Sequence, residues 1–271
     1  MKKLKITVLF AIIVLVLAAC GSSESGNGDT SSGDGEGSSY NLVEEGKLNF
    51  ASSGEFRPFS YMENGEMDGY DVAVAKAIAE KLGLEAVANK AKFSGIVTGV
   101  KQGRYDIAVA SHTITEERLA QVDFSEPYYY SGPVIYTRPD SDIKSADDLE
   151  GKEISVSRGS TYVEMAKEYT DNIPQVDSDV VALQSLAKGH HDAVITDSVT
   201  GSTAIEDGLE IAAVEQLGVS KQAVAVNKES DKLLEDINTA LKELKESGKL
   251  EELSMEYVGA DITKDPEKSS E

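Results

Sequence analysis

Hydrophobic and polar positions follow two different periods along the chain after residue 46. The segment 47–53, KLNFASS, alternates apolar and polar side chains as a half-buried strand does. In the segment DGYDVAVAKAIAEKLG the apolar residues instead recur every three or four positions, which predicts a helix that stops at Gly83. The apolar face of this helix consists of Val72, Ala75, Ile78, Ala79 and Leu82.

The same alternation of strand and helix continues to the end of the chain. Strands are predicted at 106–110, 153–157 and 193–196. A helix that ends near Gly103 precedes the first strand, a helix that begins near Tyr162 follows the second, and the helix VVALQSLAKG precedes the third. Thr113-x-x-Glu116 fits a capping box, which predicts a helix after Thr115, and Gly248 separates two final helices. Strands that alternate with helices indicate parallel α/β sheets, and two such series indicate two lobes. Ligands of such sheets bind beyond the carboxyl ends of the strands, where the turns after Ala110, Ser157 and Thr196 lie.

The first residues have a different composition and predict a signal peptide at 1–19. Three lysines precede an apolar run from Ile6 to Ala19 that only Thr7 interrupts. The run of about 14 residues is short beside the roughly 20 that cross a bilayer. It closes in LAAC with Cys20, the only cysteine of the protein. A single cysteine in an exported chain is a reactive thiol or a modified one.

A polar segment separates this leader from the patterned body. Residues 21–39 contain only Gly, Ser, Asp, Glu, Asn and Thr, which predicts a flexible tether within 20–46 with a reach of about 24 Å. The formal charge is −22 and becomes −22 − 3 = −25 once the lysines of the leader are removed. So acidic a surface repels phosphates, which excludes a nucleic-acid partner.

From about Lys47 to Gly259 the chain resembles the extracellular solute-binding proteins of polar amino acid ABC transporters. The phrases that carry the resemblance are FRPFSY, GYDVAVAKAIAEKLG, KFSGIVTGVKQGRYDIAVA, TITEER, VDFSEPYY, DDLEGKEISV, GST and DAVITD. The resemblance implies an α/β, two-lobed periplasmic-binding-protein-like fold of type II, with Rossmann-like lobes joined by a two-strand hinge. Lobe 1 is expected at 47–131 plus 225–260, lobe 2 at 132–224, and a polar tail at 261–271. The LAAC segment resembles a bacterial lipobox, whose cysteine carries a diacylglycerol, and this implies lipidation of Cys20, with palmitate among the acyl chains.

Arg118 is the one cation of the segment ASHTITEERLAQVDFSEPYY, among four acidic residues. The resemblance implies that its guanidinium grips the α-carboxylate of the ligand through two parallel hydrogen bonds. The alternative is an ion pair with one of its acidic neighbours, which contributes little at a surface.

The resemblance also assigns polar partners to the two ends of the ligand. Ser111 and Thr113 would complete the carboxylate cradle or accept from the ammonium, and Thr161 would offer a backbone N–H from lobe 2. Asp197 would bind the α-ammonium. Ser111, Thr113 and Asp197 could instead cap helices, and a strand-to-helix turn alone would favour small residues before Thr161.

Side-chain recognition is expected from aromatic and hydroxyl residues. Phe56 and Phe93 match the rings that sandwich the ligand, with burial in the core as the alternative. Ser53 stands where relatives with basic or amide substrates carry an acid, and Ser157 where glutamine binders carry a lysine. These hydroxyls favour a neutral polar amino acid, cystine or a zwitterionic compatible solute. Glu55, Arg57 and Arg158 are close enough in sequence to change that specificity.

These features predict high-affinity capture of a polar amino acid or similar small zwitterion and its delivery to an ABC permease. The protein is expected to be a monomer that a lipid anchors to the extracellular face of a Gram-positive type of cell membrane. We expect no catalytic residues, no cofactor and no metal. His190 and His191 lack nearby cysteines or spaced carboxylates that would complete a zinc site. An alternative is a cyclic-acid dehydratase-like enzyme that uses Asp197, Glu55 or His112 as acid or base. A receptor sensor domain is disfavoured because no signalling segment follows Glu271.

Overall fold

A computed structural model describes residues 40–268. The predicted signal peptide, Cys20 and the tether up to residue 39 lie outside these residues, as do residues 269–271. Among the residues described, no helix combines the length and the apolar composition needed to cross a bilayer.

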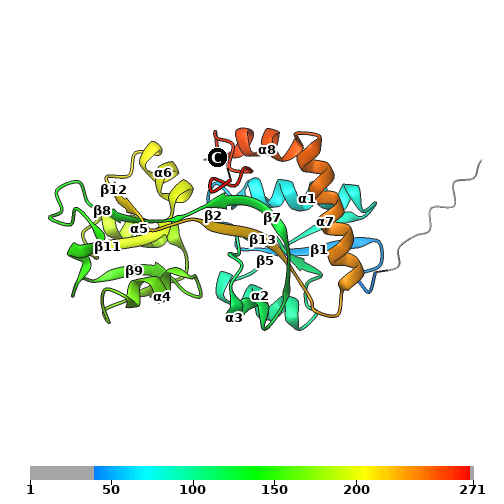
Figure 1. Cartoon of the computed structure of the whole chain (residues 1–271), viewed down its shortest axis with the longest axis horizontal. Coiled ribbons are helices and arrows are strands. Elements are labelled where there is room, and N and C mark those ends of the chain that lie inside the picture. Colours follow the sequence, from blue (N-terminus) through cyan, green and yellow to red (C-terminus); the bar gives the residue numbers. More distant parts are fainter. Residues whose placement is uncertain (1–39, 269–271) are drawn as a thin grey trace, which may run out of the picture. The chain divides into compact units, whose positions relative to one another are not determined.

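Two five-stranded sheets form the framework (Figure 1), and we call the parts built on them lobe 1 and lobe 2. The lobe 1 sheet has the order β5-β1-β6-β13-β7 and the lobe 2 sheet the order β10-β9-β11-β8-β12. The lobe 1 strands are β1 (Lys47–Ser52), β5 (Glu85–Lys90), β6 (Ile107–Ala108), β7 (Asp123–Ser131) and β13 (Ser220–Val226). The lobe 2 strands are β8 (Pro133–Thr137), β9 (Ile154–Ser157), β10 (Gln175–Val176), β11 (Ala193–Asp197) and β12 (Ala212–Gln216).

Helices pack against both sheets. In lobe 1, α1 lies against β1 and β5 and contacts the two C-terminal helices α7 and α8, which Figure 1 shows in orange beside it. The lobe 1 helices are α1 (Tyr70–Lys81), α2 (Phe93–Lys101), α3 (Glu116–Leu119), α7 (Asp231–Glu246) and α8 (Lys249–Tyr257). The lobe 2 helices are the 3₁₀ turn η1 (Ala146–Leu149), α4 (Tyr162–Lys167), α5 (Asp179–Ala187) and α6 (Ser198–Glu206).

The sheets contain the expected parallel pairs, β1 with β5 and β6 and β9 with β10 and β11, but each sheet also contains antiparallel pairs. Strand β13 runs antiparallel to β6 and β7, and β8 runs antiparallel to β11 and β12. The physical reason is the crossing of the chain between the sheets. It leaves lobe 1 through β7, continues at Gly132 into β8, and returns from β12 into β13 without a crossover helix. A strand that returns directly beside its predecessor pairs with it in the antiparallel sense.

The two crossing segments touch at a glycine. A Cβ atom on Gly132 would lie 2.1 Å from the carbonyl oxygen of Gly218, a separation that any side chain would prevent. The close approach of the outgoing and returning segments therefore requires glycine at this position. The chain changes sheet at Gly132 and between Gln216 and Ser220. The lobe boundaries expected from the sequence stay predictions.

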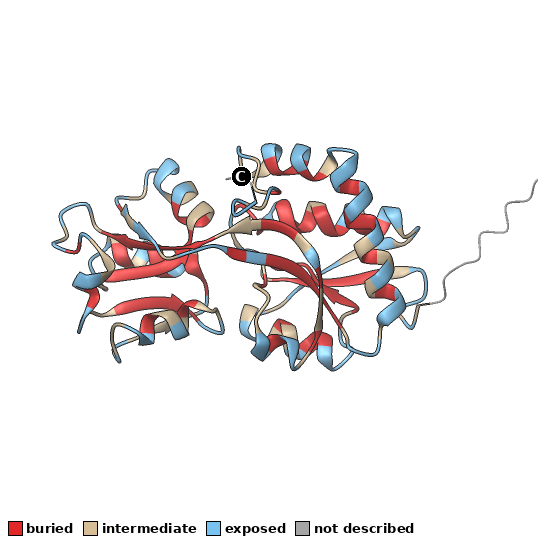
Figure 2. Cartoon of the chain, viewed as in Figure 1, coloured by how far each residue is buried: buried red, intermediate tan, exposed pale blue. Residues whose placement is uncertain are grey.

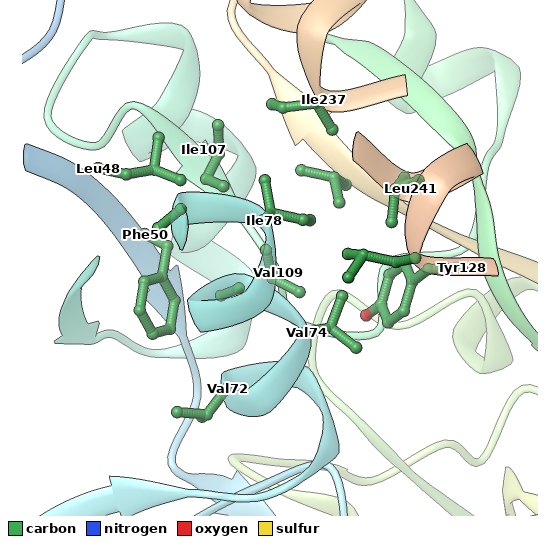
Figure 3. Packing of buried hydrophobic residues seen from close by; sticks show 14 of the residues in the cluster. Leu48, Phe50, Val72, Val74, Ile78, Ile107, Val109, Tyr128, Ile237 and Leu241 are labelled. Atoms are coloured by element: carbon green, nitrogen blue, oxygen red, sulfur yellow. The ribbon is translucent and has the colours of Figure 1, made fainter. Parts of the chain in front are cut away.

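Each lobe has hydrophobic clusters of its own. The main cluster of lobe 1 lies between the sheet and α1, α7 and α8, where Ile78 of α1 meets Ile237 and Leu241 of α7 (Figure 3). In lobe 2, Ile135, Val156 and Ile195 belong to the cluster on one face of the sheet, and Tyr136 and Val194 belong to the cluster on the other. Strands inside the sheets, such as β1, β8 and β11, are almost continuously buried, whereas the edge strands β5 and β12 are partly exposed (Figure 2).

A small antiparallel sheet before α1 sets the start of that helix. It consists of β2 (Glu55–Phe56), β3 (Ser60–Glu63) and β4 (Glu66–Asp68). Gly69 follows with φ +121°, and a Cβ there would lie 2.4 Å from the carbonyl oxygen of Phe59. The N–H of Asp71 donates to that same carbonyl at 2.9 Å. The close backbone contact therefore fixes where Asp71, the second residue of α1, enters the core.

Two local features refine the expectations from the sequence. The helix after Thr115 forms, but Thr115 caps it: its Oγ1 accepts from the N–H of Arg118 at 3.2 Å, so the predicted capping box at Thr113 is wrong. The residue directly before the first helical turn has the better geometry for this bond. At the other end of the chain, residues 261–268 of the expected tail include Ile262, whose carbonyl accepts from the N–H of Tyr130 at 2.8 Å.

Candidate functional site

A pocket lies between the lobes, with an empty volume of about 460 Å³ that includes open solvent. Lobe 1 contributes seven of its lining residues, Ser53, Glu55, Phe56, Phe93, Ser111, Thr113 and Arg118. Lobe 2 contributes the other seven, Ser157, Ser160, Thr161, Tyr162, Asp177, Ser178 and Asp179. The structure thus brings together seven of the eight ligand-binding residues expected from the sequence; Asp197 is not among the lining residues.

Arg118 supplies the cation of the pocket. Its side chain is 8% exposed, and its two terminal nitrogens donate to the carbonyls of Thr113 at 2.8 Å and of Gly159, in lobe 2, at 3.1 Å. Burial lowers the pKa of Arg118, but a guanidinium stays charged at neutral pH. A guanidinium has five N–H donors, so further donors remain for a carboxylate. None of the acidic neighbours Glu116, Glu117 and Asp123 forms an ion pair with it in the described chain.

Ser111 is held in an unusual conformation at the floor of the pocket. Its φ of +57° lies in the left-handed region, which is unfavourable for residues with a side chain. Two contacts stabilise it: its N–H donates to the hydroxyl of Tyr128 at 3.1 Å, and its Oγ donates to Asp71 at 2.8 Å. Tyr128 in turn donates to the other oxygen of Asp71 at 2.6 Å. Asp71 is completely buried and therefore fixes a pocket residue without lining the pocket itself.

Two aromatic rings face the pocket from lobe 1. Phe56 stacks on Phe59 with ring centroids 5.1 Å apart, and Phe93 stacks on His112 at 4.5 Å. The guanidinium carbon of Arg118 lies 5.8 Å from the centre of the Phe93 ring. Phe56 and Phe93 keep part of their surface exposed and line the pocket, so the structure places them where they could contact a ligand.

His112 lies behind Phe93 and does not line this pocket. Its ring is 1% exposed, and its Nδ1 has no hydrogen-bond partner among the described residues. Burial, and then the charge of Arg118, lower the pKa of His112 well below its usual value, which keeps the ring neutral. A neutral ring stacked on Phe93 acts as a flat support for the aromatic wall.

Ser53 and Thr161 reach the pocket from opposite lobes. The hydroxyl of Ser53 lies 3.1 Å from that of Ser60, next to the loop that carries Phe56. Thr161 is the residue before α4 and lines the pocket together with Ser160. This turn lies next to Arg118, whose guanidinium donates to the carbonyl of the neighbouring Gly159 at 3.1 Å.

Asp197 occupies the position of a helix cap. It is 1% exposed, and its Oδ1 accepts from the N–H groups of Val199 at 2.9 Å and Thr200 at 3.4 Å at the start of α6. Burial raises the pKa of Asp197 to about 6, against the opposing effect of a hydrogen bond from Ser131. This is the capping role that the sequence left open, and a second role in ammonium binding stays a prediction.

Sequence reasoning missed the acidic end of the pocket. It is lined by Asp177 and Ser178, between β10 and α5, and by Asp179, the first residue of α5. Asp179 is 7% exposed and accepts from the hydroxyl of Thr196 at 2.7 Å. The signal available in the sequence was a cluster of turn residues before a helix, which by itself indicates only a cap. Asp179 comes close to Ser157 and Thr196 because β9 lies between β10 and β11 in the sheet.

The three charged residues that could have changed the specificity have different surroundings. Glu55 lines the pocket but forms an ion pair with Lys90 at 2.7 Å. Arg57 stacks on the ring of Tyr61 at 3.7 Å, and Arg158 donates to the carbonyl of Gln175 at 2.9 Å. Neither arginine lines the pocket. Within residues 40–268, no three His, Cys, Asp or Glu residues lie close enough together to hold a metal ion.

The arrangement can recognise a molecule that carries both charges. One buried guanidinium and hydroxyl groups from both lobes suit a carboxylate. The buried carboxylate of Asp179 suits a cationic nitrogen, and the rings of Phe56 and Phe93 suit aliphatic carbon. Such charge-assisted hydrogen bonds are strengthened where the lobes exclude water.

Known proteins match the chain over nearly the whole described part. The family model described as "Bacterial extracellular solute-binding proteins, family 3" matches residues 48–260. The L-cystine-binding protein TcyJ of Escherichia coli is 31% identical over 230 residues, which cover 82% of this chain and 86% of TcyJ. The arginine-binding extracellular protein ArtP of Bacillus subtilis is 32% identical over 273 residues, which cover 95% of this chain and 98% of ArtP.

Solved structures show the same fold. An ancestral arginine-binding protein bound to glutamine superposes with a TM-score of 0.75 at 34% identity and covers 80% of this chain and 100% of that protein. The ancestral amino acid-binding protein AncCDT-1, a precursor of cyclohexadienyl dehydratase, has a TM-score of 0.74 at 30% identity and covers 79% of this chain and 96% of that chain. The two-lobed type II fold is therefore confirmed.

Proposed function

The chain belongs to the family 3 of bacterial extracellular solute-binding proteins, and from this premise we propose that it captures a small amino acid outside the cell membrane and delivers it to an ABC importer. The observation that carries the proposal is the pocket itself, which the buried guanidinium of Arg118 lines from lobe 1 and the buried carboxylate of Asp179 lines from lobe 2. A free amino acid carries both charges within a few bonds. Its capture outside the membrane agrees with the extracellular or periplasmic place of the family.

We propose the following roles in binding. Arg118 binds the α-carboxylate, with Thr113 and the turn at Ser160 and Thr161 as further donors. Asp197 and Ser111 receive the α-ammonium, while Phe56 and Phe93 enclose the side chain next to Ser53. Binding favours the closed arrangement, because only there does one ligand touch both lobes, and the permease would recognise that arrangement.

The predicted lipid anchor at Cys20 indicates where the protein would bind its ligand. Lipidation of Cys20 and a polar tether would keep the protein, as a monomer, at the extracellular face of the membrane while the lobes remain free to bind. The test is Cys20→Ala in cells grown with labelled palmitate: the proposal expects loss of label and release of the protein into the medium. Unchanged label and retention would contradict it.

A second candidate is catalysis on the same fold, since the family neighbours include a precursor of a dehydratase. Such an enzyme needs a placed acid or base at the ligand. His112 lies behind Phe93 and does not line the pocket, and Glu55 is paired with Lys90. These contacts favour binding without turnover, and NMR of the bound solute over hours would reveal any product.

The function is tested by thermal unfolding in the presence of each of the proteinogenic amino acids, cystine and compatible solutes. We expect a rise in the unfolding temperature with a narrow set of amino acids, because a ligand that binds only the folded state stabilises it. Arg118→Ala and Asp197→Ala should abolish the rise while the unliganded proteins still unfold cooperatively. Arg104→Ala, an exposed arginine of lobe 1, is the control and should behave like the wild type. Normal ligand-induced stabilisation of Arg118→Ala and Asp197→Ala would contradict the assigned roles.

A further inference from the structure

The lining of the pocket includes one buried carboxylate, Asp179, that the contacts proposed above for the α-carboxylate and the α-ammonium leave unused. The same lining contains one cation, Arg118, and three carboxylates, Glu55, Asp177 and Asp179. Glu55 pairs with Lys90 at 2.7 Å and Asp177 with Lys92 at 2.9 Å, and the acidic side chains of these two pairs are 49% and 57% exposed. Solvent and a lysine therefore balance both of them.

Asp179 differs from these two acids in burial and in partners. It is 7% exposed, and within residues 40–268 it forms no ion pair. Its carboxylate accepts a hydrogen bond from the hydroxyl of Thr196 at 2.7 Å, and a hydrogen bond from Ser157 counteracts the rise of its pKa that burial causes. Hydroxyl donors fix the orientation of a carboxylate but leave its charge in place, and the two oxygens can accept further hydrogen bonds.

A second buried carboxylate, Asp197, lies close enough for its pKa to be raised by Asp179, after the larger effect of its own burial. If the α-ammonium of an amino acid binds to Asp197, as proposed above, the charge of Asp179 stays without a partner. An uncompensated buried charge is expensive, so Asp179 would then require a second cationic nitrogen on the ligand. Asp71 is not a candidate for this contact, because it does not line the pocket and its two oxygens hold Ser111 and Tyr128.

We propose that Asp179 binds a cationic nitrogen on the side chain of the ligand and thereby selects amino acids with one carboxylate and two cationic groups. This inference rests on the proposed function. A guanidinium or an ammonium at the end of an aliphatic chain would pass between Phe56 and Phe93, whose faces suit both parts. A ligand with a second carboxylate, such as cystine, would require a second cation in the lining, and Arg118 is the one that the described residues provide. The proposal favours a cationic side chain over the neutral one that Ser53 and Ser157 predict.

Calorimetric titration with matched ligands tests the assignment. L-Arginine and L-citrulline have nearly the same shape but differ in side-chain charge, while L-lysine and L-cystine extend the series. We expect arginine or lysine to bind the wild-type protein at least about 30-fold more tightly than citrulline and cystine. Asp179→Asn should weaken the cationic ligand by at least about 30-fold, since truncating one partner of a buried charge pair has effects of this order, and should change citrulline binding less than about threefold.

A control variant and a stability measurement separate a specific role of Asp179 from a general effect. Asp171→Asn removes an exposed carboxylate of the same lobe and should leave every affinity unchanged. The melting temperature of unliganded Asp179→Asn should match or exceed that of the wild type, because a buried charge is removed. Tighter binding of citrulline or cystine than of both cationic ligands would overturn the inference. An equal loss for all ligands in Asp179→Asn would overturn it too, since Asp179 would then bind the α-ammonium. Absence of binding by every amino acid would instead overturn the proposed function.

Discussion

The two walls of the pocket differ in charge and in how the chain builds them. The lobe 1 wall carries the buried cation Arg118 and the two rings, and most of its residues come from short motifs such as 111–118. The lobe 2 wall carries the buried acid Asp179 and is assembled from two separate segments, which follow β9 and β10. Neither wall alone can satisfy both ends of a zwitterion. The difference shows how the ligand itself becomes the contact that makes closure of the lobes favourable.

The lobe 1 wall depends on a buried carboxylate that never meets the ligand. Asp71→Asn is expected to weaken ligand binding by about tenfold to a hundredfold, because hydrogen bonds to a charged group hold Ser111 in its left-handed conformation. Titration calorimetry of the variant measures this loss. Asp171→Asn serves again as the exposed control.

The same variant has a pH signature that a general packing defect would lack. Burial raises the pKa of Asp71 to about 7 from 3.8, so the native protein binds more protons than the unfolded chain between these values. The contribution of this group to stability is then lost as pH rises from about 4 to 7, by up to about 1.4 kcal/mol per pH unit. Asparagine does not titrate, so the free energy of unfolding of Asp71→Asn relative to wild type should increase between about pH 5 and pH 8. Urea unfolding at both pH values measures the difference, and a constant difference would contradict it.

The smallest effect is expected from the contact that joins the two walls at the rim. Lys92 of lobe 1 and Asp177 of lobe 2 are 2.9 Å apart, but their side chains are 78% and 57% exposed. Exposed ion pairs contribute little and are screened by salt, so Lys92→Ala should change ligand affinity by less than about threefold. That change should disappear at about 0.5 M salt. A larger, salt-resistant loss would mean that the rim rather than the buried groups determines closure.

The same contrast explains how much could be predicted from the sequence. Periodicity identified most of the major elements, since strands such as β1 and helices such as α1 are fixed by local patterns. Arg118, Ser111 and Thr113 were found because they lie within one contiguous motif at the end of a strand. Antiparallel pairing of β13 could not be predicted, because it depends on the return of the chain between two sheets rather than on any local pattern.

Asp179 and Asp197 show most clearly which properties of the site could not be predicted from the sequence. Both are acids at the start of a helix, and such a residue favours a cap irrespective of any ligand. Only the order of β9, β10 and β11 brings Asp179 beside Ser157 and Thr196 at the pocket, while Asp197 is fixed by two backbone N–H groups of α6. Their environments, and hence their proposed roles, are properties of the folded sheet and not of the residues beside them in the sequence.

The central claim is that Arg118 binds the carboxylate of a small molecule enclosed by both lobes. The most direct measurement is a double-mutant cycle by calorimetry, with wild type and Arg118→Ala each titrated with L-arginine and with agmatine, which lacks only the carboxylate. We predict that removing either partner weakens binding by at least about 30-fold and that removing both adds little to the loss. Losses that simply add, or agmatine binding to wild type as tightly as arginine does, would contradict the account.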